Sequence, residues 1–396
     1  MDFNLTDEQR MIQELARDFA TDVLAPAAPI IDQTEEYPFD NCRKMGELGL
    51  MGIEVPQEDG GTGADTVSYV VALEEVSKAC AATGTIMSVN NSLVCHGLAK
   101  YGTLEQREKY LRPAASFERI GTFGLSEPQA GSDAASQRTR AIKDGDHYIV
   151  NGAKNFISSG GVADFHIVFC VTDPEARPKH HGISCLLIEA DTPGFSAGKP
   201  EEKLGIRAAN TAALSFEDCR VPVSSRLGDE GQGFRISMEV LDAGRIGIAA
   251  QALGIAQASL DASRHYALER EQFGKPLAEH EAIQFMLADM ATRTEAARLL
   301  TLKAAVKKQR KERYSLEAAM AKLYASETAM WVAHKAVQIH GGYGYVREYN
   351  VERYFRDAKI TEIYEGTSEV QRMVIARYML GDQSRLHQRT QTRSGL

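Results

Sequence analysis

Apolar and polar positions follow a helical period in two long regions of the chain, one near each end. The first runs from Leu5 to about Glu118 and predicts a helical N-terminal domain over residues 1–118. The second predicts a C-terminal helical bundle over residues 231–380, built from long Ala-rich helices. A polar tail, residues 381–396, is expected to follow the bundle.

The first helix carries its own start and stop signals. Thr6 followed by Gln9 has the spacing of a capping box, in which the two side chains satisfy free N–H groups at a helix start. The apolar pattern then continues to Pro26. Because proline cannot donate a backbone hydrogen bond, we expect the helix to end there.

The region between the two helical parts has the pattern of short strands. Its apolar runs are HYIV, FHIVFCV, GISCLLIEA and TAALSFEDCRVP. The dipeptides Asp144-Gly145 and Asn151-Gly152 are strong turn signals on either side of HYIV. Strands at this spacing predict a small β-barrel or sandwich over residues 119–230. The expected fold class is therefore multi-domain α+β.

Composition and charge disfavour several kinds of protein. The 396-residue chain has a formal net charge of −9, which argues against a nucleic-acid partner. No apolar run approaches the ~18 residues of a membrane span. The N-terminus has no signal or transit pattern, so a cytoplasmic protein is expected. The six cysteines form no CxxC pair and the ten histidines no HExxH motif, which predicts core cysteines and no metal site.

Two motifs in the strand region could contact a ligand. FGLSEPQAGSD, residues 123–133, offers polar groups around Gly131, although an ordinary Pro/Gly turn is the simpler interpretation. NGAKNFISSGG, residues 151–161, places Phe156 between polar residues. A lone aromatic side chain in a strand is more often a core residue than the cover of a flat cofactor.

Two further motifs lie beside the long helices. REQFGKPL begins with Arg270, whose planar guanidinium suits a phosphate, although a solvated arginine is the usual interpretation. In QIHGGYGYV, Gly341 and Gly342 could end a helix and let a ligand approach the backbone. The preceding element has a helical pattern, so this is not the GxGxxG of a nicotinamide site.

The stretch IYEGTSEVQR, residues 363–372, holds one acid, Glu365, with only neutral residues beside it. Most such residues are solvated loop carboxylates. The alternative is a base held in an apolar pocket, where burial favours the neutral acid and raises its pKa.

Taken together, the motifs resemble one family in order and spacing, over nearly the whole chain. The chain resembles the acyl-CoA dehydrogenases, and among them the short-chain, butyryl-CoA type. The blocks that carry the resemblance are KMGELGLMGIEVP, ALEEVSKACAATGTIMSVNNSL, LSEPQAGSD, DAGRIGIAAQALGIAQASLD and RDAKITEIYEGTSEVQR. Five ordered blocks are far more specific than any single motif.

The resemblance implies FAD as the cofactor and assigns residues to it and to the substrate. The residues implied to contact FAD are Phe123, Leu125, Ser126, Gly131, Ser132, Phe156, Ile157, Ser158, Arg270, Phe273, Gln338, Ile339, Gly341, Gly342, Thr367 and Glu369. Those implied to contact the acyl-CoA thioester are Ser132, Asp242, Arg245 and Gly366.

Glu365 matches the catalytic base of the family. The resemblance implies that it removes the α-proton of a short-chain acyl-CoA while hydride passes from the β-carbon to flavin N5. The product is the trans-2-enoyl thioester. The family also implies a homotetramer built as a dimer of dimers, with an electron-transfer flavoprotein as electron acceptor. A short branched-chain dehydrogenase and an acyl-CoA oxidase stay open as alternatives on the same fold.

Three positions refine the resemblance. Some relatives carry the base at the position of Gly244, so no second acid competes with Glu365. Phe156 stands where many members have tryptophan, and Glu281 where short-chain relatives commonly have glutamine, which puts a contact of Glu281 with FAD in doubt. The stretch AATGTIMSV lacks the arginine of relatives that act on dicarboxylic substrates, so such a substrate is disfavoured.

Overall fold

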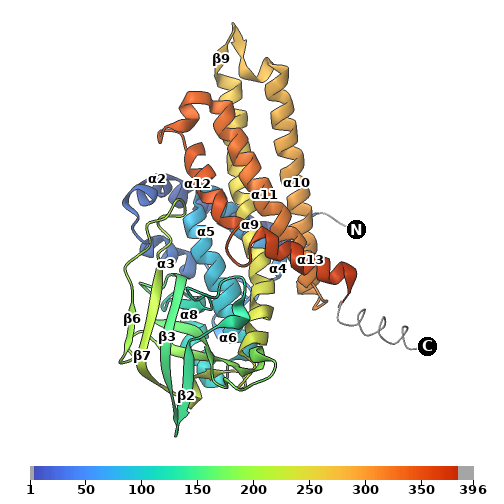
Figure 1. The fold of residues 1–396 in the computed structure, drawn as a ribbon. Coiled ribbons are helices and arrows are strands. Elements are labelled where there is room, and N and C mark those ends of the chain that lie inside the picture. Colours follow the sequence, from blue (N-terminus) through green and yellow to red (C-terminus); the bar gives the residue numbers. More distant parts are fainter. Residues whose placement is uncertain (1–3, 382–396) are drawn as a thin grey trace, which may run out of the picture.

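The computed structural model describes residues 4–381, which form helices, then strands, then helices again (Figure 1). This order confirms the predicted α+β class. Residues 116–120 and 228–232 lie between elements of different kinds. The expected tail lies, from residue 382 onward, outside the described residues.

The N-terminal helices are short, and several are joined end to end by π-helical turns. Their bounds are α1 Asp7–Phe19, η1 Ala20–Leu24, α2 Ala25–Thr34, α3 Phe39–Glu47, η2 Gln57–Asp59, α4 Thr66–Ala79, α5 Ala81–Ser88, η3 Val89–Cys95, α6 His96–Tyr101, α7 Leu104–Gln106, η4 Arg107–Leu111 and α8 Arg112–Ala115.

The start of the first helix agrees with the sequence, but its end does not. Thr6 and Gln9 form both bonds of the capping box, which confirms the predicted start. The expected stop at Pro26 is wrong, because α1 continues through η1 into α2, which carries Pro26 in its first turn. Pro26 lacks the N–H that would continue the helical bonds, and the run accommodates it directly after the π-helical turn η1, where the N–H of Ala25 donates to the carbonyl of Ala20. The run ends only at Glu35, which has a left-handed φ of 60°.

The middle region is one eight-stranded sheet. Its strands are β1 Gly121–Gly124, β2 Arg140–Asp144, β3 His147–Ser158, β4 Phe165–Val171, β5 Ile183–Glu189, β6 Phe195–Ala197, β7 Thr211–Pro222 and β8 Arg226–Leu227. The strand order is β6-β7-β3-β2-β4-β5-β8, with β1 paired to β4 in parallel. Short 3-10 turns, η5 Ala134–Ser136, η6 Lys179–Gly182 and η7 Val223–Ser225, lie between strands.

The central strands β4 and β5 are apolar on both faces because both faces are covered. Ile167 and Phe169 of β4 pack with the N-terminal helices and the start of the long helix α9 (Gly233–Glu269). Val168 and Cys170, which point the other way, join a second core inside the sheet region. A strand buried on both sides has a continuous apolar run rather than alternation, as FHIVFCV does.

Only one of the two predicted turns beside HYIV forms. Asp144-Gly145 connects β2 to β3, as expected. Asn151-Gly152 is not a turn but a bulge inside β3, where the register with β7 shifts and Gly152 has φ 143°. Asn151 exchanges two hydrogen bonds with Asp218 of β7, of 2.9 and 3.0 Å. These cross-strand bonds hold the dipeptide in the sheet.

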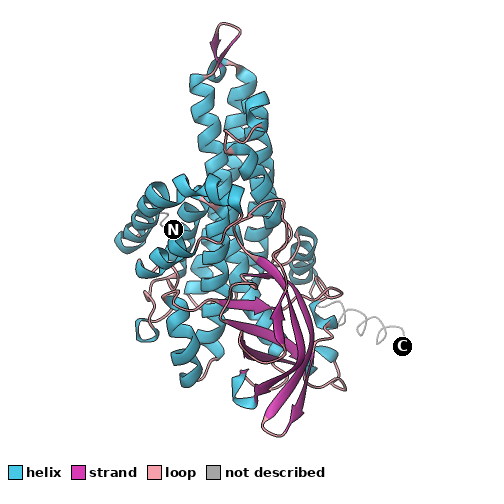
Figure 2. Ribbon diagram, turned by 90° about the vertical axis from the view of Figure 1, so that its left-hand side faces the viewer, coloured by secondary structure: helices cyan, strands magenta, loops and turns pink. Residues whose placement is uncertain are grey.

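Long helices dominate the C-terminal part. Its elements are α9 Gly233–Glu269, β9 Glu271–Gln272, β10 Lys275–Pro276, η8 Leu277–Glu279, α10 Glu281–Gln309, α11 Ser315–His340, η9 Gly341–Tyr345, α12 Val351–Thr361 and α13 Ser368–Leu380. The helices α9, α10 and α11 pack side by side, with the β9–β10 hairpin at the end far from the sheet (Figures 1 and 2). The first half of α9 reaches back to the sheet, so one helix links both parts.

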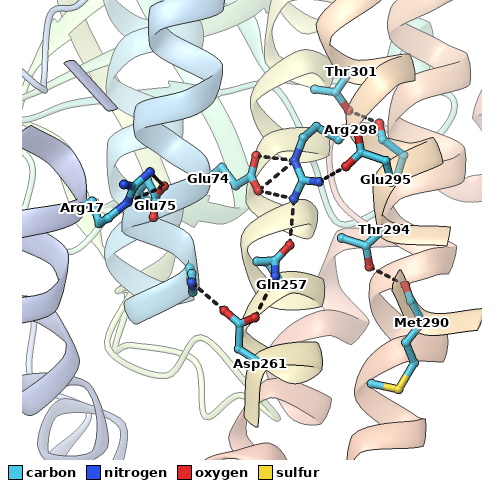
Figure 3. Close-up of polar contacts among 12 residues, drawn as sticks. Arg17, Glu74, Glu75, Gln257, Asp261, Met290, Thr294, Glu295, Arg298 and Thr301 are labelled. Atoms are coloured by element: carbon cyan, nitrogen blue, oxygen red, sulfur yellow. Dashed lines mark hydrogen bonds and ion pairs between the residues drawn. The ribbon is translucent and has the colours of Figure 1, made fainter. Parts of the chain in front are cut away.

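A polar network fastens the N-terminal helices to this bundle (Figure 3). Glu74 of α4 accepts a 2.8 Å hydrogen bond from Arg298 of α10, which also donates to Gln257 of α9. Lys78 of α4 pairs with Asp261 of α9 at 2.6 Å. Glu74 is largely buried, so losing its partner would leave an uncompensated carboxylate in the interior.

The cysteines behave as the sequence predicted: all six are buried and unpaired. Within residues 4–381, no helix is long and apolar enough to cross a membrane. The same residues contain no cluster of three or more His, Cys, Asp or Glu side chains that could hold a metal ion.

Candidate active site

Glu365 occupies a tight turn between α12 and α13. It has φ 52°, and the following Gly366 has φ 95°, so two successive residues are left-handed. Such a conformation is costly for a residue with a Cβ and persists only where the surroundings hold it. The next residue, Thr367, caps α13 by accepting a hydrogen bond from the N–H of Val370. Glu365, in this turn, lines a cleft together with Tyr364 before it and Gly366 after it.

The carboxylate of Glu365 is not solvated. The residue as a whole is half-buried because it lines an open cleft, yet its Oε2 is fully buried and makes no hydrogen bond to any described residue. Burial raises the pKa of Glu365 to about 8, and the cations Lys322 and Arg245 oppose that rise. The interpretation as a solvated loop residue is therefore wrong. A carboxyl group with a pKa near neutrality suits a general base.

The cleft in front of Glu365 has a volume of about 290 Å³ and is built from six parts of the chain. They are η3, the strand β1 with the loop after it, the end of β3, the start of α9, the Glu365 turn and the start of α13. Its lining residues are Val89, Leu93, Phe123, Leu125, Ser126, Gly131, Ser132, Asp133, Ala134, Ala135, Phe156, Ile157, Ser158, Phe234, Met238, Leu241, Arg245, Tyr364, Glu365, Gly366 and Val370. The structure thus brings eleven residues that the sequence singled out into one cleft: Phe123, Leu125, Ser126, Gly131, Ser132, Phe156, Ile157, Ser158, Arg245, Glu365 and Gly366.

Phe156 is the clearest correction to the residue-by-residue analysis. A lone aromatic residue in a strand favoured a core position, but Phe156 is 68% exposed and lines the cleft. Its φ of 57° is left-handed, and the pairing of β3 with β7 is irregular between Lys154 and Ile157. This irregularity turns Phe156 outward while Ile157 beside it stays buried.

A buried ion pair supports the loop that follows β1 and lines the cleft. Lys154 of β3 donates to the carbonyl of Leu125 at 3.2 Å and to Glu127 Oε1 at 2.8 Å. The backbone N–H of Asn155 donates to the carbonyl of Ser126 at 2.9 Å. These bonds fix the backbone at Leu125 and Ser126, which leaves the Ser126 side chain available to a ligand.

Asp242 and Arg245 form a pair, of which only Arg245 lines the cleft. Arg245 Nη1 lies 2.5 Å from Asp242 Oδ1, while Ser315 donates to Asp242 Oδ2 at 2.5 Å. Burial raises the pKa of Asp242, and Arg245 opposes that rise. Asp242 therefore orients Arg245 from behind rather than facing the cleft itself.

A second cleft, of about 550 Å³, gathers other predicted residues at the far end of α9. Arg270, Ile339, Gly341 and Gly342 line it, and the Arg270 guanidinium lies 5.4 Å from the ring centre of Tyr343. Arg270 follows Arg245 along α9 by about 37 Å at 1.5 Å per residue. The two clefts of one chain are therefore farther apart than one extended dinucleotide reaches.

Four predicted cofactor residues line neither cleft. Phe273 is 96% exposed at the tip of the β9–β10 hairpin, and Gln338 lies on the exposed side of α11. Thr367 and Glu369 belong to the first turn of α13, where Thr367 is the cap. Glu281, whose contact was in doubt, begins α10 and is exposed.

Sequence reasoning missed part of the site. Phe234, Met238 and Leu241 of α9 line the first cleft, but their helical spacing looks like that of any core helix. Lys322 was also missed. It is fully buried in α11, and its Nζ donates to the carbonyl of Gly366 at 2.7 Å. A single lysine inside the apolar run AAMAKLYA was the available signal.

The first cleft fits a flat ring with polar edges. Phe156 and Ile157 offer apolar surface, and a Cβ added to Gly131 would meet nothing within 4 Å, so the backbone there is open to a ligand. In the second cleft, Gly341 and Gly342 are open in the same way beside the Arg270 cation. An open backbone next to a guanidinium suits a phosphate.

Comparison with known families gives one consistent result across the chain. Residues 6–118 match the family model "Acyl-CoA dehydrogenase, N-terminal domain". Residues 122–219 match "Acyl-CoA dehydrogenase, middle domain", and residues 231–380 match "Acyl-CoA dehydrogenase, C-terminal domain".

Individual proteins give the same picture. The short-chain specific acyl-CoA dehydrogenase of Clostridium acetobutylicum is 52% identical over 95% of this chain and 99% of its own. The butyryl-CoA dehydrogenase structure from Megasphaera elsdenii superposes with a TM-score of 0.94 at 47% identity, over 96% of this chain and all of that one. A chain in the structure of the electron-transferring flavoprotein of Acidaminococcus fermentans gives a TM-score of 0.95 at 50% identity, with the same coverage.

Proposed function

Because this chain belongs to the acyl-CoA dehydrogenase family, whose members are FAD-dependent oxidoreductases, we propose that it oxidises a short-chain acyl-CoA to the trans-2-enoyl-CoA with Glu365 as the base. The observation that carries the proposal is the buried, unpaired Oε2 of Glu365 at the wall of a cleft that fits a flat ring.

Glu365 performs the proton-transfer half of the reaction. The α-hydrogen of a thioester is a weak acid, so a base with a raised pKa removes it more readily than an ordinary carboxylate would. A pKa of about 8 is some 3.5 units above that of a free glutamate, and each unit is worth ~1.4 kcal/mol of base strength. Closing the cleft with an acyl chain strengthens this effect by removing water.

The enolate formed by proton removal needs a hydrogen-bond donor at the thioester oxygen. In our proposal the backbone N–H of Glu365 is this donor, and it makes no hydrogen bond to any described residue. A preorganised donor of this kind is worth roughly 3 kcal/mol in related acyl-transfer sites. In our proposal Arg245 and Ser132, which line the same cleft, bind the CoA portion of the substrate.

FAD, when bound, supplies the hydride acceptor for the β-carbon. In our proposal Phe156 and Ile157 cover one side of its ring, and the loop over residues 123–133 binds its polar edge. The second cleft, with Arg270, Gly341 and Gly342, then holds the phosphate end of the cofactor of a neighbouring subunit. The distance between the two clefts supports a site shared by two subunits, and the homotetramer is proposed from the family resemblance alone.

Anaerobic flavin bleaching with butyryl-CoA tests the reaction. The holoenzyme is expected to lose its yellow absorbance with butyryl-CoA, while Glu365→Gln binds the ligand without bleaching. Full bleaching of Glu365→Gln would remove Glu365 from the role of base. A panel of straight and branched thioesters, with peroxide measured in air, separates the short-chain enzyme from a branched-chain dehydrogenase or an oxidase.

We propose an electron-transfer flavoprotein as the acceptor of the electrons from the reduced enzyme. The similarity to a chain found with the electron-transferring flavoprotein of Acidaminococcus fermentans supports such a flavoprotein as the acceptor. Reoxidation of the reduced enzyme by an added electron-transfer flavoprotein, faster than by air, tests it. A cytoplasmic location stays a prediction.

A further inference from the structure

Lys322 is a buried cation without a carboxylate partner. It lies in the middle of α11, its side chain is fully buried, and it forms no ion pair with any carboxylate of residues 4–381. Its Nζ makes a single hydrogen bond, to the carbonyl of Gly366 at 2.7 Å. Burying an ammonium group this way is expensive unless a nearby charge or function compensates it.

The bond from Lys322 ends on the turn that carries the base. The carbonyl of Gly366 also accepts from Gln371 Nε2 at 2.9 Å, and the carbonyl of Glu365 accepts from the same amide at 3.3 Å. Both residues of the turn have left-handed φ values. Lys322 and Gln371 therefore provide the side-chain hydrogen bonds that hold this costly conformation, beside the backbone bond of 2.9 Å from the N–H of Ser368 to the carbonyl of Glu362.

Two cations, Lys322 and Arg245, lower the pKa of Glu365 against the effect of burial. From α9 comes Arg245, whose charge is already balanced by its ion pair with Asp242. From α11 comes Lys322, which has no such pair. The other titratable groups coupled to Glu365 are the phenols of Tyr69 in α4 and of the adjacent Tyr364.

Around Lys322 itself, the acids Glu362 and Glu369 interact more weakly than Glu365 does. Burial lowers the pKa of Lys322 to about 8, and Glu365 is the strongest influence that opposes this fall. Of the two cations, Lys322 has the larger effect on the pKa of Glu365, and it has no ion pair of its own. In turn, Glu365 is the acid that most favours the charged form of Lys322.

We propose that Lys322 is a positioning residue of the active site: its ammonium group holds the Glu365–Gly366 turn through the Gly366 carbonyl and supplies the positive charge that faces the Glu365 carboxylate. The proposal rests on the proposed function, since it concerns the same base. Without this charge, the carboxylate of Glu365 loses its principal compensation, and the base stays protonated to a higher pH.

The test uses Lys322→Met, which removes charge and donor, and Lys322→Gln, which keeps a donor but removes the charge. Lys335→Met, on the same helix but beside Trp331, is the matched control. The FAD-loaded enzymes are incubated with acetyl-CoA in D₂O, and deuterium entering the methyl group is followed by mass spectrometry. Acetyl-CoA has α-hydrogens but no β-carbon, so exchange reports the base alone. FAD content and thermal midpoint are measured alongside.

In the wild type and Lys335→Met, exchange is expected to rise with pH through the same midpoint. In Lys322→Met and Lys322→Gln the midpoint moves upward by about one pH unit or more, with FAD content retained. If the pH midpoint of exchange is unchanged in both Lys322 variants, Lys322 does not act through its charge. If Lys322→Met also matches wild type in exchange rate and in thermal midpoint, Lys322 does not hold the Glu365–Gly366 turn either. If Glu365→Gln exchanges as fast as wild type, the proposed function itself fails instead.

Discussion

Gly244 of α9 lies directly against the carboxylate of Glu365, so closely that a Cβ at position 244 would overlap Oε2. The same Cβ would also crowd Leu93 of η3. Glycine at 244 and glutamate at 365 are therefore sterically coupled. Position 244 holds the base in some relatives. Here it must be a glycine, because any side chain at 244 would overlap the carboxylate of Glu365.

This relationship makes Gly244→Ala a sharp test of the position of the base. Alanine favours the helix by up to ~1 kcal/mol, so α9 itself should not suffer. We expect the rate of flavin reduction by butyryl-CoA to fall about 10²-fold, because a displacement near 1 Å has that effect on a reacting group. Stopped-flow absorbance measures it, and Arg264→Ala on the exposed side of α9 is the control. A Gly244→Ala enzyme as fast as wild type would contradict the contact.

Replacing the base should abolish chemistry without abolishing binding. Glu365→Gln keeps the volume of the side chain but cannot accept the α-proton. The rate of flavin reduction is expected to fall about 10²- to 10⁴-fold, the usual contribution of a general base. Perturbation of the flavin spectrum by a bound thioester should persist in the variant. Loss of the spectral perturbation together with the rate would point to a collapsed site instead.

The pH dependence follows from the raised pKa of the base. Glu365 acts only when ionised, and burial raises its pKa to about 8. The kcat/KM for butyryl-CoA, which reports the free enzyme, should therefore rise from pH 6 to pH 9 with a midpoint near pH 8. Steady-state assays in constant-ionic-strength buffers measure this. A plateau already reached at pH 6 would mean that the carboxylate is as accessible to water as an ordinary glutamate.

The same shift affects stability, with a definite sign. The folded pKa of Glu365 lies above the unfolded value near 4.5, so its favourable contribution is complete below pH 4.5 and is lost as the pH rises through about 8. Glu365→Gln, which never ionises, should therefore unfold at a higher temperature than wild type at pH 8. Calorimetry of the two holoenzymes should show the difference shrinking towards pH 5. A constant difference at both pH values would exclude a titrating carboxyl group as the cause.

Phe156 should matter to the cofactor and hardly at all to the fold. Its ring is 68% exposed, so Phe156→Ala should change the free energy of unfolding of the apoprotein by no more than about 0.5 kcal/mol. The affinity for FAD should fall about fivefold, since an aromatic contact is worth ~1 kcal/mol beyond its area. Titration of the apoprotein by flavin fluorescence measures it. Ile142→Ala, on the exposed surface of β2, is the control and should leave FAD affinity unchanged.

Local patterns in the sequence determined the class of fold, and the resemblance of five ordered blocks to one family supplied the candidate residues. The capping box at Thr6, the turn at Asp144-Gly145 and the buried cysteines needed only their neighbours in the chain, and the structure confirms them. The unusual setting of Glu365 among neutral residues was also visible there. These features depend on interactions between residues that are close in the sequence, so the sequence alone is enough to predict them.

Only the tertiary structure decided which residues meet. Phe156 is exposed because β3 is irregular beside it, and the Asn151-Gly152 turn is cancelled by bonds to Asp218 on another strand. The buried charge of Lys322, forty-three residues before Glu365 in the chain, reaches the base because α11 packs beneath its turn. Desolvation and long-range charge depend on packing in three dimensions, so no local pattern could reveal how strongly the base is tuned.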